Sequence, residues 1–185
     1  PGSPEFLRYL YDNAARGEAF SPDNWTPKFH FSHSFSADSL EAHMHHTVEK
    51  LMDEKDSAPY VIPPPSHKFG HIKKFRAVKR GVSGCLIELA VETSTGNWHF
   101  KKELVIRKLF ENPEAGVKRL NSARIFFGET FSHLGLLETL SVKGLGFGHG
   151  VGFQQTGAHG LAKFRGLNYR QIIAHYFKDV EIETT

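Results

Sequence analysis

The stretch Gly144-Leu-Gly-Phe-Gly-His-Gly-Val-Gly152 is the most informative part of the chain, and Phe-Gln-Gln-Thr-Gly-Ala (residues 153–158) follows it directly. Glycine alternates with another residue throughout its nine positions. A packed strand disfavours so many glycines, because each one weakens the strand and adds no side chain. The spacing therefore predicts a shaped loop that presents His149, Gln154 and Gln155 to a ligand. A glycine-rich bend with a solvated histidine explains the spacing equally well.

Two phosphate-binding loops are excluded by the residues around these glycines. A Walker A loop needs a lysine directly after its last glycine, and none follows here. A dinucleotide fingerprint needs a third glycine at its sixth position. Counted from Gly144, Gly146, Gly148 or Gly150, that position holds His, Val, Phe or Gln. Nucleotide binding therefore loses its main support, and we expect no cofactor.

The composition predicts one globular domain with an ordinary core. The chain has 185 residues, of which 39% are hydrophobic and 12% aromatic. Its single cysteine excludes an internal disulfide. No apolar run approaches the roughly 18 residues of a membrane span, so we expect no membrane segment. The formal charge of +3 permits binding to an anionic polymer without demanding it.

The pattern of the chain predicts an α+β fold with a mostly antiparallel sheet and several short helices. Strands are expected where apolar residues alternate or cluster between turn residues, at 25–35, 70–79, 86–93, 98–104, 124–131, 137–142 and, more weakly, 180–182. Helices are expected where apolar residues recur at helical spacing behind a capping residue, at 6–17, from Ser36 or Asp38 to about 55, and at 105–110, 158–164 and 169–177.

We divide the chain at its Pro-Pro-Pro run. Residues 1–6, Pro-Gly-Ser-Pro-Glu-Phe, are typical of a cleavage and cloning remnant and are excluded from the fold prediction. Residues 7–62 form an N-terminal helix–strand–helix part. Residues 63–66 are a proline-rich connector, since consecutive prolines are stiff and extended. Residues 67–185 form the C-terminal core.

Several ordered motifs resemble the SpoIID/LytB family. Gly146-x-Gly-His-Gly-Val-Gly152-x-x-Gln155-x-Gly-Ala158, followed by a helix that ends Ile-Ile-Ala-His-Tyr-Phe177, is similar to the C-terminal signature of that family. Upstream, 79–84 (Lys-Arg-Gly-Val-Ser-Gly), 104–107 (Leu-Val-Ile-Arg) and 120–126 (Leu-Asn-Ser-Ala-Arg-Ile-Phe) resemble further family segments in the same order. The similarity covers roughly the last hundred residues well.

The resemblance implies a SpoIID-like fold that binds and remodels the glycan strands of peptidoglycan. It also implies the cell envelope as the location and other cell-wall hydrolases as partners. Glycans present hydroxyl and acetamido groups, which suit side chains that both donate and accept, together with an aromatic face such as Tyr169 or Tyr176. The expected substrate-binding residues are His149, Gln154, Gln155, Tyr169 and, by resemblance, Arg80 and Arg107. The glycines expected to shape the loop are Gly146, Gly148, Gly150, Gly152 and Gly157.

The chain also departs from the family pattern. SpoIID-like proteins are lytic transglycosylases whose proposed acid is a glutamate in an N-terminal Ala-rich segment, and no such segment occurs here. Cys85 stands where the family has arginine, and Phe153 where it has methionine. The catalytic acid is therefore unknown, with His149 able only to assist, and enzymatic activity stays open. The alternatives are a glycan-binding module without catalysis and a protein-interaction domain that enhances an amidase.

Two other clusters have ordinary explanations. His43 and His46 share a helix face, but two side chains are too few for a closed metal site, and we expect no metal. The basic residues of 71–80 resemble a polyanion track, with Lys74, Arg76 and Arg80 on one face. Nucleic-acid binding would require aromatic residues interleaved with that charge, so we favour a solvated strand and expect no nucleic acid.

Overall fold

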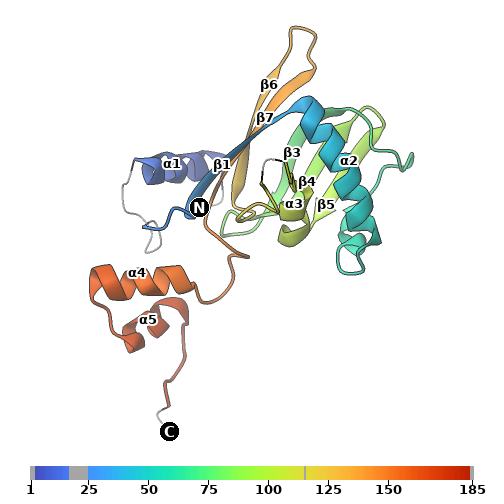
Figure 1. Cartoon of the computed structure of the whole chain (residues 1–185). Helices are drawn as coiled ribbons and strands as arrows, with labels where there is room; N and C mark the ends of the chain where they lie inside the picture. Colours follow the sequence, from blue (N-terminus) through green and yellow to red (C-terminus); the bar gives the residue numbers. More distant parts are fainter. Residues whose placement is uncertain (1–2, 17–24, 115, 184–185) are drawn as a thin grey trace.

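The computed structural model describes residues 3–16, 25–114 and 116–183. Two antiparallel sheets and several helices make up an α+β fold (Figure 1). The helices are α1 (Pro4–Ala15), α2 (Ala37–Asp53), the 3-10 turn η1 (Ala58–Tyr60), α3 (Glu103–Leu109), α4 (Gln155–Arg165) and α5 (Tyr169–Tyr176). The strands are β1 (His30–Ser36), β2 (Val61–Ile62), β3 (Ile72–Arg80), β4 (Leu86–Thr93), β5 (Gly96–Lys101), β6 (Ile125–Phe131) and β7 (Leu137–Leu145).

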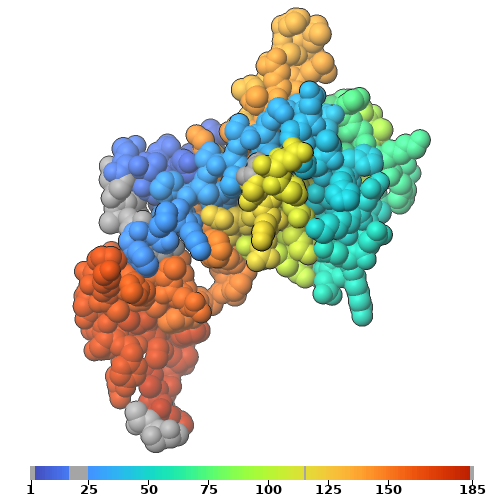
Figure 2. Space-filling model, in the orientation of Figure 1, coloured from blue at the N-terminus to red at the C-terminus, as the bar shows by residue number. Residues whose placement is uncertain are grey.

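The two sheets have the strand orders β1-β7-β6 and β2-β5-β4-β3. Figure 1 shows α2 and α3 beside the second sheet, whereas the β6–β7 ribbon extends beyond the body. The C-terminal helices α4 and α5 form a separate lobe at the lower left, at the end of the molecule away from the β6–β7 ribbon (Figure 1, Figure 2). The connection between β7 and α4 therefore joins the body to this lobe, and it contains the glycine loop.

A continuous aromatic and aliphatic core holds the sheets and helices together. Trp98 and Phe100 of β5 are among its largest fully buried side chains. Phe110, just after α3, contacts Phe35 of β1 and Phe75 of β3, with ring centroids 6.2 and 5.9 Å apart. Since both sheets contribute to the same cluster, burial of their apolar faces fixes one sheet against the other.

Most predicted elements are confirmed, with shifts at their ends. The strand predicted at 86–93 coincides with β4, and α2 begins at the predicted cap, where Ser36 Oγ accepts a hydrogen bond from the Ser39 amide over 3.3 Å. Helix α5 begins at the predicted Tyr169, where Asn168 and Gln171 form a capping box. The strand predicted at 25–35 begins only at His30.

Two predictions at the ends of the chain differ from the structure. The weak strand at 180–182 is wrong: these residues pair with no strand in the described part of the chain, and Val180 is half exposed beyond the end of α5. The first helix begins at Pro4, before the predicted residue 6, because Ser3 caps it and Pro4 fits the first turn. Residues 1–2 and Gly17 lie outside the described residues.

The strands also relate the two predicted parts of the chain. The proline connector at 63–66 lies between β2 and β3. β1, before it, pairs with β7, and β2 pairs with β5. The N-terminal part and the C-terminal core therefore share both sheets.

Candidate functional site

The glycine loop begins where β7 passes between β1 and β6. Gly144 pairs with Phe31 on one side and Ile125 on the other. A Cβ at Gly144 would collide with the ring of Phe31 and the Ile125 side chain. Gly144 is therefore a packing glycine of the strand, and the loop proper starts after Leu145.

Backbone hydrogen bonds hold the start of the loop in place. The Gly146 amide donates to Phe29 O over 2.5 Å, and the Gly148 amide donates to Asn121 O over 2.8 Å. Ser122 Oγ donates to Leu145 O over 2.6 Å and accepts from the Arg124 amide over 3.1 Å. The segment 120–124, singled out in the sequence by the family resemblance, thus supports the loop from one side.

Alternate loop residues have a backbone conformation that favours glycine. The φ angles of Gly146, Gly148, Gly150 and Gly152 are +82°, +108°, +75° and +83°. Residues with a Cβ rarely adopt such angles. The alternation of glycine in the sequence therefore has a direct cause in the shape of the loop.

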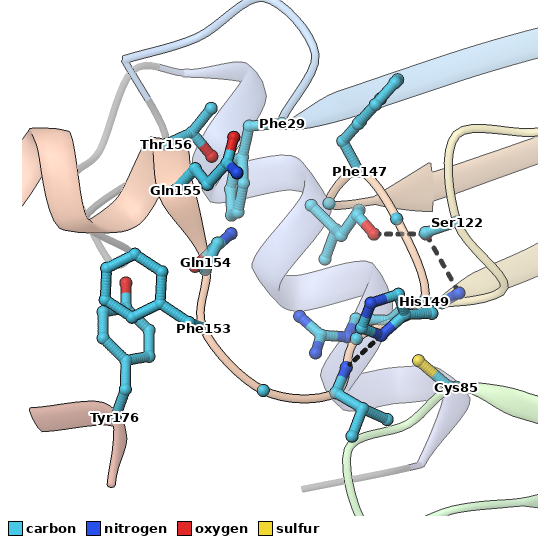
Figure 3. Close-up of a pocket in the computed structure, with 17 residues that line it drawn as sticks. Phe29, Cys85, Ser122, Phe147, His149, Phe153, Gln154, Gln155, Thr156 and Tyr176 are labelled. Atoms are coloured by element: carbon cyan, nitrogen blue, oxygen red, sulfur yellow. Dashed lines mark hydrogen bonds between the residues drawn. The ribbon is translucent and has the colours of Figure 1, made fainter. Parts of the chain in front are cut away.

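His149 is fixed within the loop by a local hydrogen bond. The Val151 amide donates to Nδ1 of His149 over 3.0 Å (Figure 3). An accepting Nδ1 places the ring proton of the neutral imidazole on Nε2. Nε2–H is then the donor that His149 can offer to a ligand.

Helix α4 begins directly after the loop and carries the two glutamines. Gln154 occupies the N-cap position and Gln155 the first helical position. Gly157 was predicted to shape the loop, but it lies within α4. A Cβ there would collide with the Tyr176 hydroxyl and the Gln154 side chain, so this glycine permits close packing of α5. On the far side of α4, Trp25 Nε1 donates to Thr156 O over 3.2 Å, and its ring lies 5.1 Å from that of His159.

These elements enclose a pocket of about 410 Å³. Figure 3 shows His149 and Cys85 on one side of it, with Phe153, Gln154 and Tyr176 on the other. The rings of Phe153 and Tyr176 lie 5.0 Å apart. The residues lining the pocket are Phe29, Cys85, Ser122, Arg124, residues 145–156 and Tyr176.

The chemistry of the lining is aromatic, amide and cationic. Gln154 and Gln155 can each donate and accept hydrogen bonds. Arg124 contributes a positive charge. None of the described residues that line the pocket is an aspartate or a glutamate, so the lining offers no carboxylic acid for general acid catalysis.

The pocket brings together only part of the predicted substrate-binding set. His149, Gln154 and Gln155 line it, whereas Tyr169, Arg80 and Arg107 are not among its lining residues. Tyr169 is half exposed at the start of α5, and its hydroxyl accepts a hydrogen bond from Arg170 Nε over 3.0 Å.

The two predicted arginines make internal contacts instead. Arg107 is buried on α3, where Nε donates to Leu120 O over 2.9 Å and Nη1 lies 3.2 Å from Glu103 Oε2. Arg80 donates to Gly84 O over 3.0 Å at the turn between β3 and β4. Burial lowers the pKa of the Arg80 guanidinium, which remains charged because its ordinary pKa is so high.

Among the lining residues outside 145–176, sequence reasoning missed all four: Phe29, Cys85, Ser122 and Arg124. Phe29 precedes β1, and Cys85 ends the β3–β4 turn. Both residues reach the pocket because strands far apart in the sequence pair with each other, and the sequence alone does not reveal that pairing. Ser122 and Arg124 lay within a segment that the resemblance had marked, but nothing in it distinguished these side chains from their neighbours.

The other two clusters have local partners. Nδ1 of His43 lies 2.5 Å from Ser39 O, and Arg76 Nε lies 3.5 Å from Glu92 Oε1 on the neighbouring strand. In the described ranges, no group of three or more His, Cys, Asp or Glu side chains could hold a metal ion. None of the described helices has the length and apolarity that crossing a membrane requires.

Comparison with known proteins identifies a family for most of this fold. No curated protein matches the chain. A family described as "Domain of unknown function (DUF8618)" matches residues 28–152, which run from just before β1 to the last glycine of the loop. The matched segment contains both sheets and the whole glycine loop and ends before α4. The chain therefore belongs to the DUF8618 family.

Proposed function

We propose that the glycine-loop pocket binds amino-sugar glycan strands of the peptidoglycan type without cleaving them. One observation carries the proposal: side-chain amides and aromatic rings converge on a pocket whose floor is a hydrogen-bonded glycine loop. Aromatic faces pack against the apolar faces of sugar rings. Amides match hydroxyl and acetamido groups because they offer both donors and acceptors.

The pocket dimensions and the sequence resemblance support this ligand class. About 410 Å³ falls within the 300–1,000 Å³ that small-molecule sites occupy. The resemblance to SpoIID/LytB proteins rests on the same loop and on α4 and α5, the segments that form much of the pocket. The volume admits a small-molecule ligand, and the resemblance adds the sugar class, peptidoglycan and the cell envelope.

Binding without cleavage is favoured over transglycosylation by the charges of the pocket. Glycosidic cleavage requires a protonated acid beside the leaving oxygen. The described lining supplies cationic, amide and aromatic side chains but no carboxyl group. The residues of this site are therefore suited to hold a glycan strand and not to break it.

Sedimentation with insoluble glycans tests the proposal. The protein should sediment with purified peptidoglycan sacculi and with chitin, but not with cellulose, which lacks the acetamido group. Titration calorimetry with soluble chitotetraose then gives the affinity. The proposal would be contradicted if the protein bound neither peptidoglycan nor soluble amino-sugar oligosaccharides.

A protein-interaction domain is the second candidate, favoured by the exposed aromatic side chains of the C-terminal lobe. Phe164, Tyr169 and Phe177 are each 40–59% exposed on or beside α4 and α5. Exposed apolar side chains that gather on one lobe are typical of interaction surfaces. If this candidate is correct, Phe164→Ser with Tyr169→Ser should abolish enhancement of a purified cell-wall amidase while glycan binding is unchanged.

A further inference from the structure

We propose that Arg124 makes the glycine-loop pocket selective for a carboxylate, so that the pocket prefers acidic amino sugars to neutral ones. This inference rests on the proposed glycan binding and adds a specific residue and a specific ligand group to it. It starts from Arg124, whose arginine side chain lines the pocket.

Among the described residues, the side chain of Arg124 has no hydrogen-bond partner at its Nε, which is buried. No ion pair or side-chain hydrogen bond of Arg124 occurs among those residues either. A buried polar atom without a partner is costly, and such atoms in native proteins call for an explanation. A ligand that accepts hydrogen bonds supplies one.

The backbone of Arg124 is held firmly although its side chain is unpaired. Its amide donates to Ser122 Oγ over 3.1 Å, and its carbonyl accepts from the Leu145 amide over 3.0 Å. Ser122 in turn donates to Leu145 O, where the loop leaves β7. The same contacts that anchor the glycine loop therefore position the arginine relative to it.

Other groups around the pocket favour a negative charge over a positive one. His149 offers Nε2–H as a donor, since its Nδ1 accepts from Val151. Lys28 Nζ lies 4.9 Å from the ring centroid of Phe147, which lines the pocket. No described lining residue carries a negative charge that would neutralise Arg124. The local field therefore attracts anions.

Among anions, a carboxylate suits an arginine best. The planar guanidinium donates two parallel hydrogen bonds to a carboxylate, whereas a sugar hydroxyl accepts only a single bond of ordinary strength. N-acetylmuramic acid differs from N-acetylglucosamine by a lactyl ether that ends in a carboxylate. A pocket that uses Arg124 in this way should distinguish these two amino sugars.

Two tetrasaccharides of equal length test the inference by calorimetry. One alternates N-acetylglucosamine with N-acetylmuramic acid and has free lactyl carboxylates, and the other is chitotetraose. Wild type should bind the acidic one about tenfold or more tightly, the range expected of a charge-assisted pair. Arg124→Gln should remove that preference, because it should weaken binding of the acidic tetrasaccharide much more than binding of chitotetraose. Arg119→Gln is the matched control, because it removes the same charge from an exposed side chain outside this pocket.

The outcomes separate this inference from the proposed function. Equal affinity of wild type for both ligands, or equal losses for both in Arg124→Gln, would overturn the carboxylate subsite and leave glycan binding intact. Binding of neither ligand would overturn both. Should Arg124→Gln fail to fold, methyl esterification of the ligand carboxylates tests the same contact on the wild-type protein. Esterified and free ligands of equal affinity would also contradict the inference.

Discussion

Gly150 and Cys85 lie against each other: a Cβ built on Gly150 would be 3.1 Å from Cys85 Sγ. The contact joins the glycine loop to the turn between β3 and β4, two segments 65 positions apart in the sequence. Gly152 has a similar φ, +83° against +75°, but open space around its Cα. Substitutions at these two positions can therefore be compared to separate the cost of the backbone conformation from the cost of the contact with Cys85.

We predict that alanine at Gly150 or Gly152 destabilises the protein, with the larger effect at Gly150. A left-handed residue with a Cβ costs about 1–2 kcal/mol, and at Gly150 the Cys85 side chain must also move. Valine at either position should cost more, because positive φ is worst for β-branched residues. Urea unfolding measures the free energies, and Cys85→Ala should remove the difference between the two alanine variants. Equal costs at both glycines would contradict a contact effect.

Arg107 should prove to be a stability residue and not a ligand residue. Its buried guanidinium bonds to Leu120 O and pairs with Glu103. Arg107→Ala should lower the free energy of unfolding by about 2–4 kcal/mol, since hydrogen bonds to charged groups contribute about 1.5–3 kcal/mol each and packing is lost as well. Glycan affinity of the folded variant, measured by calorimetry below its melting temperature, should equal that of wild type. If Arg107→Ala lost glycan affinity while its free energy of unfolding stayed unchanged, Arg107 would be a ligand-binding residue after all.

Within the pocket, His149→Ala and Gln155→Ala should weaken glycan binding without unfolding the protein. Both side chains are largely exposed, so the melting temperature should change by no more than a few degrees. Loss of one hydrogen bond costs about 0.5–1.5 kcal/mol, which corresponds to roughly twofold to twelvefold weaker affinity for chitotetraose. Tyr169→Ala, which lies outside the pocket lining, is the control and should bind like wild type. A stronger effect at Tyr169 than at His149 would place the glycan elsewhere.

His33 should make stability fall in mildly acidic solution. It lies on β1 between Phe31 and Phe35, with ring centroids 5.8 and 6.4 Å away. Burial lowers the pKa of its imidazole, whereas the unfolded chain keeps the ordinary value of about 6.5. As the pH falls below about 6.5, the unfolded state takes up the proton first, and stability is lost. The melting temperature of His33→Gln should therefore depend less on pH between about 7 and 5 than that of wild type. The same pH dependence of the melting temperature in both proteins would contradict this.

The sequence predicted the loop because its signal is local, and it failed where contacts are long-range. Alternating glycines permit unusual φ angles and weaken a strand, so a loop at 146–152 could be predicted without knowing its neighbours. Cys85 and Phe29 reach the pocket only because β4 and β1 fold beside the loop, and no spacing within the chain encodes that.

Tyr169 and Arg107 show the limits of transferring a site from motif order alone. Tyr169 precedes Tyr176 by seven residues on α5, so it lies about 10 Å further along the helix axis, and only Tyr176 reaches the pocket. Arg107 stands on a short helix whose arginine is turned inward to Leu120. The order of motifs names the segments that carry these residues, but the direction of each side chain depends on packing.

The last prediction concerns catalysis: the protein should release no anhydro-muropeptides from purified sacculi. The described pocket lining has no carboxyl group. Glu129 on the nearby sheet accepts a hydrogen bond from the Phe75 amide over 2.7 Å and is not among the lining residues, and Glu138 is exposed on β7 outside the lining. Mass spectrometry of digests measures the products, with a known lytic transglycosylase as the positive control. Anhydro products from wild type that disappear in Glu129→Gln or Glu138→Gln would place an acid in this chain and convert the binding proposal into an enzymatic one.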